Sequence, residues 1–218
     1  MGTLNTWLEY GRALDIALLR KINVDWSGSF LDRLMAAVSD FNLFLIPLIA
    51  GAMLLIVFGN FRERLLIVLL ALCVLIGDTG ISSTLKATVY RPRPHEALEG
   101  IREVSLKEIT WSHPTPHHRG RSFPSSHVCN NVALALVAVM LYGRWAHLLW
   151  FWALLMSYSR VYVGSHYPSD TAASWIIALV YTWAILRGCE WLWQKYAPRL
   201  TPGLYAAHPR LQRLKADG

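Results

Sequence analysis

Three separated clusters hold the charged, hydroxyl and imidazole side chains of this sequence that could do chemistry together. In chain order they comprise Lys86, Arg93 and Pro94; Pro124, Ser125, Ser126 and His127; and Ser159, Arg160, His166 and Asp170. Arg93 and Arg160 offer planar guanidinium groups that bond oxygen atoms in pairs, and Lys86 adds a mobile point charge. Three cations of this kind favour a tetrahedral anion such as phosphate.

The second cluster, Pro124 to His127, has the pattern of a loop that enters a helix. Free backbone N–H groups and the positive end of a helix favour a phosphate oxygen at such a point. The hydroxyls of Ser125 and Ser126 would add further donors. A histidine there can hold a proton near neutral pH and deliver it to a leaving oxygen, so we expect His127 to be a general acid.

In the third cluster, His166 lies four residues before Asp170. This spacing lets the carboxylate hold one ring nitrogen while the other nitrogen attacks phosphorus, so we expect His166 to be the nucleophile. Pro168 suits the start of a helix, which would place His166 just outside it and Asp170 in its first turn. Each residue type alone has a simpler role as an interfacial group, a cap or a dipole partner. The joint spacing is what favours a site.

The clusters resemble the signature of the type-2 phosphatidic acid phosphatase superfamily, Lys-x6-Arg-Pro, Pro-Ser-Gly-His and Ser-Arg-x5-His-x3-Asp. The resemblance implies that His166 takes the phosphoryl group, that Asp170 supports it and that His127 protonates the leaving group. Ser126 stands where the pattern has glycine, which adds a side chain next to the phosphate. The phosphate-binding residues that the resemblance implies are Lys86, Arg93, Ser125, Ser126 and Arg160.

The same resemblance implies chemistry without a metal or another cofactor, because the cations replace the carboxylate cluster that magnesium would need. The stretch His113 to His118 could bind a transition metal, but a solvated loop is the simpler interpretation. His95 is expected to touch the substrate. Asp78 lies inside an apolar run, where we expect it to hydrogen-bond within the bundle rather than to orient the basic cluster. The three cysteines have neither disulfide nor zinc-ligand spacing.

Apolar runs close to the ~20 residues that cross a bilayer must position these clusters. Because unpaired backbone groups are costly in hydrocarbon, each run should be a helix. The predicted fold class is therefore all-α: one domain over residues 1–218, forming a polytopic membrane bundle of five or six transmembrane helices. Residues 1–40 form an N-terminal amphipathic segment, whose part Leu31 to Val38 is either interfacial or the start of a longer first span. The five runs are Phe41 to Phe58, Leu65 to Leu85, Val128 to Tyr142, Ala146 to Val163 and Thr171 to Trp193.

The composition, 54% hydrophobic and 16% charged, excludes an ordinary soluble protein. The net charge of +7 suits anionic lipid better than nucleic acid, since no basic-aromatic nucleic-acid module is present. Following the chain through the five runs places all three clusters on one face, with residues 86–126 as its outer loop. The other face carries the basic tail, residues 196–218, so it should be cytoplasmic. We expect a bacterial cytoplasmic (inner) membrane protein whose active site faces outward, to the periplasm.

These inferences predict an integral-membrane hydrolase that removes phosphate from a lipid phosphate or diphosphate through a phosphohistidine intermediate. A polyprenyl (undecaprenyl) diphosphate is the first expected substrate. Phosphatidylglycerophosphate, phosphatidate and lipid A phosphate are alternatives, as is phosphoryl transfer to another lipid. Two other classes are a non-catalytic lipid-binding protein, against which the intact motifs argue, and a vanadate-dependent haloperoxidase, against which the membrane spans argue.

Overall fold

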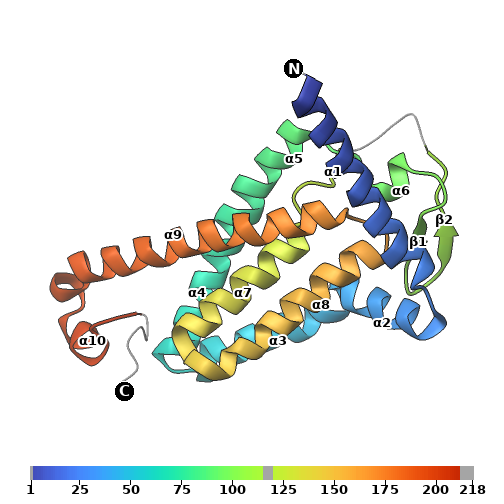
Figure 1. The fold of residues 1–218 in the computed structure, drawn as a ribbon. Helices are drawn as coiled ribbons and strands as arrows, with labels where there is room; N and C mark the ends of the chain where they lie inside the picture. The colour runs from blue at the N-terminus through green and yellow to red at the C-terminus, as the bar shows by residue number, and fades with distance from the viewer. Residues whose placement is uncertain (1, 115–119, 212–218) are drawn as a thin grey trace.

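The computed structural model describes residues 2–114 and 120–211, apart from the side chains of residues 2–8. This part of the chain folds into an elongated helical bundle with one small β-hairpin (Figure 1). The α-helices are α1 (Gly2–Arg20), α2 (Ser29–Ser39), α3 (Phe41–Phe58), α4 (Phe61–Cys73), α5 (Ser83–Val89), α6 (Pro94–Ala97), α7 (Ser126–Tyr142), α8 (Leu148–Tyr162), α9 (Pro168–Leu200) and α10 (Pro202–Ala207). The other elements are the π-helices η1 (Lys21–Asp25) and η2 (Val74–Ser82), the 3-10 helix η3 (Gly143–His147) and the antiparallel strands β1 (Arg102–Val104) and β2 (Ile109–Trp111).

Helix α7 lies at the centre of the bundle and packs against α4, α8 and α9. Its inward face consists of small and β-branched side chains, among which Cys129 and Val132 are fully buried against Ala178 of α9. Small residues at such contacts let helix backbones approach closely, which van der Waals packing in a membrane requires. Cys73 and Cys129 are buried, free thiols in this core.

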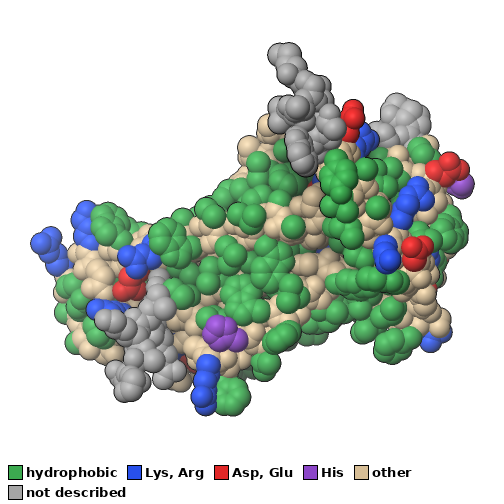
Figure 2. Space-filling view, viewed as in Figure 1, with side chains coloured by type: hydrophobic (Ala, Val, Ile, Leu, Met, Phe, Trp, Pro, Cys, Tyr) green, Lys and Arg blue, Asp and Glu red, His purple; other side chains and the backbone are tan. Residues whose placement is uncertain are grey.

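Four helical stretches in the described part of the chain are long and apolar enough to cross a membrane. They are Phe41–Phe58, Phe61–Ala97, Ser126–Tyr162 and Pro168–Leu200. The third stretch contains two of the predicted runs, α7 and α8, which turn at η3 and pack against each other. The all-α membrane bundle is confirmed, whereas the number of five or six crossings stays a prediction. On the face that Figure 2 shows, apolar side chains cover the middle of the bundle and charged ones gather toward its ends.

Helix α3 is almost entirely apolar and has no buried residue, as expected of a helix that faces lipid. It does not continue from α2, because the backbone is extended at Asp40 and this side chain accepts a hydrogen bond from the N–H of Asn42 at 2.9 Å. A carboxylate in this position satisfies one of the free N–H groups of the helix start. Leu31 to Val38 therefore belongs to a separate helix.

The N-terminal segment lies across the end of the bundle where α9 begins (Figure 1). A buried network joins it to the outer loop: Asn23 donates to the carbonyl oxygens of Arg102 and Tyr162 at 2.8 and 2.6 Å. The Arg102 guanidinium donates to Asp32 at 2.7 Å, and the Tyr162 hydroxyl donates to the other oxygen of that carboxylate at 2.7 Å. Buried charges need partners of this kind. The network fixes the hairpin over the ends of α2 and α8.

At the opposite end of the bundle, α9 extends past the predicted limit at Trp193 to Leu200. The chain then turns through α10 and returns, so that the indole of Trp193 donates to the carbonyl oxygen of His208 at 2.9 Å. The His208 ring stacks on Phe61 with centroids 4.3 Å apart. The described part of the basic tail is therefore attached to the bundle.

Candidate active site

The loop between α8 and α9 positions His166. Gly164 has φ +76°, and a Cβ atom there would lie 2.4 Å from the carbonyl oxygen of Arg102, so this turn accommodates glycine best. Pro168 begins α9, as predicted, and Asp170 accepts a hydrogen bond from the N–H of Tyr167 at 3.1 Å. This contact closes the first turn of α9, and His166 lies in the loop immediately before the helix.

His166 is 2% exposed, and its Nδ1 lies 2.6 Å from the carbonyl oxygen of Ser122. A carbonyl oxygen only accepts hydrogen bonds, so Nδ1 must carry the proton. In a neutral imidazole the other nitrogen, Nε2, then has the free electron pair. The structure thus gives His166 the tautomer that a nucleophile needs.

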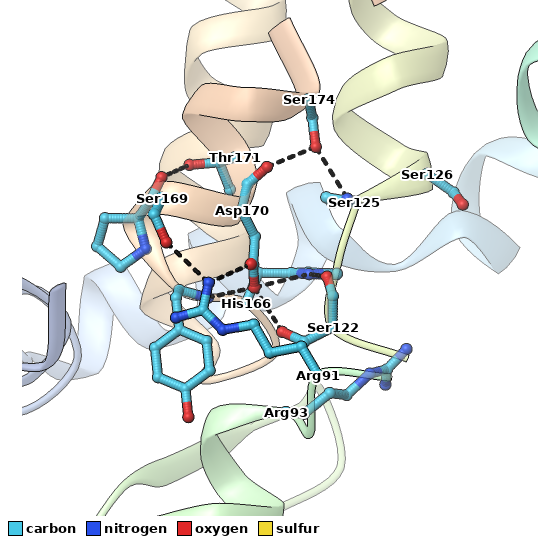
Figure 3. A network of polar contacts seen from close by, with 12 residues as sticks. Arg91, Arg93, Ser122, Ser125, Ser126, His166, Ser169, Asp170, Thr171 and Ser174 are labelled. Atoms are coloured by element: carbon cyan, nitrogen blue, oxygen red, sulfur yellow. Dashed lines mark hydrogen bonds and ion pairs between the residues drawn. The ribbon is translucent and has the colours of Figure 1, made fainter. Parts of the chain in front are cut away.

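The partner of Nδ1 differs from the one that the sequence predicted. Asp170 is fully buried, but its Oδ2 lies 3.9 Å from Nδ1, beyond hydrogen-bond distance. The same Oδ2 accepts from the Ser122 hydroxyl at 2.5 Å. Because the helix start draws the carboxylate back toward its own N–H groups, Asp170 supports His166 through Ser122 instead of holding the ring directly (Figure 3).

The surroundings of His166 favour its neutral form. Burial lowers the pKa of His166 well below the usual 6.5, and the positive charges of Arg160 and Arg93 lower this pKa further. His127 lowers the pKa of His166 slightly further. A neutral imidazole among cations is suited to attack an anionic phosphate.

The Pro-Ser-Ser-His segment meets α9 at the start of α7. The N–H of Ser125 donates to the Ser174 hydroxyl at 2.9 Å, and that hydroxyl donates to the carbonyl oxygen of Asp170 at 2.6 Å. Ser125 occupies the N-cap position, yet its own hydroxyl makes no capping hydrogen bond. Lys86 donates to the hydroxyl of Ser126, which joins the first cluster to the second.

Three polar atoms at this site are buried and lack a hydrogen-bond partner within the described chain: Arg93 Nε, Ser125 Oγ and Arg160 Nε. The Arg160 guanidinium is otherwise held through its Nη1, which donates to the Ser39 hydroxyl at 2.8 Å. A buried donor without a partner is costly, and a bound anion would satisfy it. Donors on three different elements are thus available to a phosphate.

The remaining predicted residues have mixed outcomes. His95 Nδ1 lies 3.0 Å from the carbonyl oxygen of Gly164, so it braces the loop of His166, and contact with substrate stays a prediction. Asp78 lies in η2, half-buried. Most of the His113 to His118 stretch lies outside the described residues. Within the described chain, no group of His, Cys, Asp and Glu side chains is arranged to hold a metal ion.

Sequence reasoning missed four residues that hold the site together. Arg91 pairs with Asp170 at 2.6 Å, Ser122 lies between Asp170 and His166, and Ser174 joins the starts of α7 and α9. Asp15 of α1 is only 7% exposed. Its spacing of four and seven residues from Leu19 and Ile22 puts it on an apolar helix face, which is the one hint of burial in the sequence and does not name a partner.

Comparisons with known proteins agree with this architecture. The family model described as the PAP2 superfamily matches residues 48–194. The chain is 29% identical over 208 residues to a lipid A 4'-phosphatase of Bacteroides thetaiotaomicron, covering 93% of this chain and 85% of that protein. It is 26% identical over 152 residues to the undecaprenyl-diphosphatase BcrC of Bacillus subtilis, covering 70% and 72%.

The fold also resembles a crystal structure described as the first transmembrane PAP2 type phosphatidylglycerolphosphate phosphatase from Bacillus subtilis. The TM-score is 0.56 at 20% identity, over 86% of this chain and 89% of that one. The family match covers more than half of the chain and includes every predicted site residue from Lys86 to Asp170. The chain therefore belongs to the PAP2 superfamily, as a membrane-spanning phosphatase with several helical spans.

Proposed function

We propose that this protein hydrolyses the terminal phosphate of a membrane lipid phosphate or diphosphate through a phosphohistidine on His166, without a metal ion. The observation that carries the proposal is the hydrogen bond from His166 Nδ1 to the Ser122 carbonyl oxygen, which leaves Nε2 unprotonated. The unpartnered donors of Arg93, Ser125 and Arg160 support the binding of phosphate oxygens beside it.

In the proposed reaction Nε2 of His166 attacks phosphorus, and the bond between phosphorus and the lipid oxygen breaks. His127 donates its proton to that oxygen, which leaves as the lipid alcohol or lipid phosphate. A water molecule then gives a proton to His127 and attacks the phosphohistidine, which releases inorganic phosphate and restores His166. Lys86 and the two arginines balance the charge on the phosphoryl oxygens in both steps.

Undecaprenyl diphosphate is our first substrate candidate, since a compact membrane phosphatase with an outward site suits it and the relative BcrC is named for this substrate. Lipid A 4'-phosphate is the second candidate, because the relative of that name matches 93% of the chain. Each is a lipid that ends in an accessible phosphate monoester or diphosphate. Phosphatidylglycerophosphate and phosphatidate complete the panel that we would test.

The proposal is tested by phosphate release from that lipid panel by purified protein in detergent with EDTA. We expect release that resists chelation and is abolished in His166→Ala, while His147→Ala, an exposed histidine in η3, keeps wild-type activity. Transfer of the phosphate to a second lipid would identify a transferase instead. Absence of release from every lipid, or equal release by His166→Ala, would contradict the proposal.

The role of His127 is tested with p-nitrophenyl phosphate, whose leaving group needs no proton. His127→Ala should lose at least tenfold more kcat on the lipid than on p-nitrophenyl phosphate, because general acids contribute about 10² to 10⁴ where the leaving group is poor. Equal losses on both substrates would refute the assignment. His166→Ala should fail on both.

We also propose that the site faces outward. At the opposite end of the bundle the described chain carries several cations, which the positive-inside rule places in the cytoplasm. They are Arg62, Arg64, Arg144, Arg187, Lys195, Arg199 and Arg210. On intact cells, a membrane-impermeant maleimide should label Leu106→Cys in the outer loop but not Trp145→Cys in η3, both exposed positions. The reverse pattern would invert the topology.

A further inference from the structure

The buried face of α1 carries a carboxylate that contacts the start of α9. Asp15 Oδ1 accepts from the backbone N–H of Ser169 at 2.8 Å, and Oδ2 accepts from the Ser169 hydroxyl at 2.5 Å. The N–H of Ser169 belongs to the first turn of α9, where donors have no partner within the helix. A carboxylate from another helix therefore caps the helix that holds Asp170.

Arg91 joins this cap to the site. Its Nη2 donates to Asp15 Oδ2 at 2.6 Å, while its Nη1 donates to Asp170 Oδ1 at 2.6 Å and to the Ser169 hydroxyl at 2.8 Å. The guanidinium carbon lies 3.9 Å from the centre of the Tyr167 ring. A planar fork with five donors is suited to bind two carboxylates at once in this way.

Arg91 is distinct from the predicted phosphate-binding arginine two residues later. The two side chains extend in opposite directions: Arg91 reaches toward Asp170 and Ser169, and Arg93 points away from them (Figure 3). Asp170 is fully buried, so its charge requires a paired cation, and Arg91 provides it. The side chain of Arg91 therefore holds Asp170.

The contacts continue to the nucleophile without a gap. Asp170 accepts from the Ser122 hydroxyl, and the carbonyl oxygen of Ser122 accepts from His166 Nδ1. The path from α1 therefore runs through Asp15, Arg91, Asp170 and Ser122 to His166, and every step is a hydrogen bond of 2.5 to 2.6 Å.

We infer that Asp15 and Arg91 are positioning residues for His166, so that the N-terminal helix α1 is part of the catalytic unit and not only a membrane-surface segment. The inference rests on the proposed function of His166. Loss of the Asp15 charge leaves Arg91 free to shift toward Asp170. This shift changes the position of Ser122, and with it the direction in which Nε2 of His166 points. The phosphate-binding cations are untouched by this change.

The test compares Asp15→Asn, Arg91→Gln and the double variant with the wild type, in detergent, on the lipid that the wild type hydrolyses best. Asp15→Asn keeps an oxygen that can accept from the Ser169 N–H, so α1 should stay docked. Arg91→Lys is made in parallel as a second single variant that keeps the charge. Glu9→Gln, on an exposed position of the same helix, is the matched control. Thermal melts and size-exclusion profiles restrict the kinetics to folded protein.

We expect kcat to fall about 10- to 100-fold in each single variant, since small misplacements of a reacting group have effects of this size. KM and the inhibition constant of inorganic phosphate should change less than about threefold. The double variant should be less than about threefold slower than Arg91→Gln alone, because Asp15 acts through Arg91. Glu9→Gln should match the wild type.

Folded Asp15→Asn and Arg91→Lys proteins with wild-type kcat would overturn the inference, as would fully multiplicative losses in the double variant. A rise in KM with unchanged kcat would also overturn it, because it would assign these residues to substrate binding. A wild type that releases no phosphate from any lipid would instead refute the proposed function, so the two failures are distinguishable.

Discussion

Replacement of Asp170 by asparagine removes one negative charge from beside His166, the proposed nucleophile, while keeping the size of the side chain. In the proposed mechanism the ring of His166 becomes positive as it attacks phosphorus, and the carboxylate oxygen 3.9 Å from Nδ1 would stabilise that charge. Coulomb's law with an effective dielectric constant of about 20 gives roughly 4 kcal/mol at this distance. This energy corresponds to about 10³ in rate, and Arg91 on the other carboxylate oxygen reduces it. We therefore expect kcat to fall by roughly 10² to 10³.

The asparagine also leaves a mismatch, because its NH₂ group must face either Arg91 or the Tyr167 N–H, where a carboxylate oxygen accepted before. An unsatisfied buried donor lowers the free energy of unfolding by about 1–3 kcal/mol, which a thermal melt in detergent would detect. Ser122→Ala separates the loss of the carboxylate charge from the loss of hydrogen bonding. It removes the hydroxyl that donates to Asp170 but keeps the Asp170 charge and the carbonyl oxygen that holds His166 Nδ1. We expect Ser122→Ala to lose less kcat than Asp170→Asn.

The assay is single-turnover phosphate release at saturating enzyme, with Asp25→Asn as an exposed control on the N-terminal segment. Folded Asp170→Asn protein within about fivefold of the wild-type rate would refute electrostatic stabilisation of the His166 ring by this carboxylate. Asp170 would then serve only to cap α9.

Three further features have measurable consequences: the buried pair of Asp32 and Arg102, the turn at Gly164 and the neutral ring of His166. Asp32→Asn breaks the buried pair with Arg102 and should lower the free energy of unfolding by roughly 3–5 kcal/mol, measured by denaturant or thermal unfolding; a loss below about 1 kcal/mol would show that the pair is effectively solvated. Gly164→Ala forces a Cβ atom against the Arg102 carbonyl oxygen at positive φ and should destabilise the fold by about 2 kcal/mol or more and lower activity. Gly100→Ala is the control, because Gly100 also has positive φ but has open space for a Cβ atom; if its activity is unchanged, the loss in Gly164→Ala is not a general effect of positive φ. Histidine NMR should show His166 neutral, with its proton on Nδ1, down through pH 6.5. The unfolded chain binds a second proton on this ring at a higher pH than the folded chain does, so stability falls as the pH drops below about 6.5. Titration of His166 at or above that pH would contradict the lowering of its pKa by burial.

Local sequence is enough to specify the membrane bundle and the start of the helix beside His166. Long apolar runs leave a helix as the only structure that satisfies the backbone in lipid, so the spans follow from local composition. The spacing of His166, Pro168 and Asp170 likewise specifies that α9 begins between His166 and Asp170, because proline at the first position and a carboxylate in the first turn are local preferences.

The packing of the helices, in contrast, sets which atoms these residues contact. The i to i+4 spacing predicted that Asp170 would hold the His166 ring, but the carboxylate is drawn to the N–H of Tyr167 and to the hydroxyl of Ser122 from another segment. Contacts between residues far apart in sequence depend on how the helices pack, and no local periodicity encodes that packing. For the same reason Asp15 on α1 resembled one more polar residue of an amphipathic helix, although the fold places it 2.6 Å from Arg91 at the base of the site.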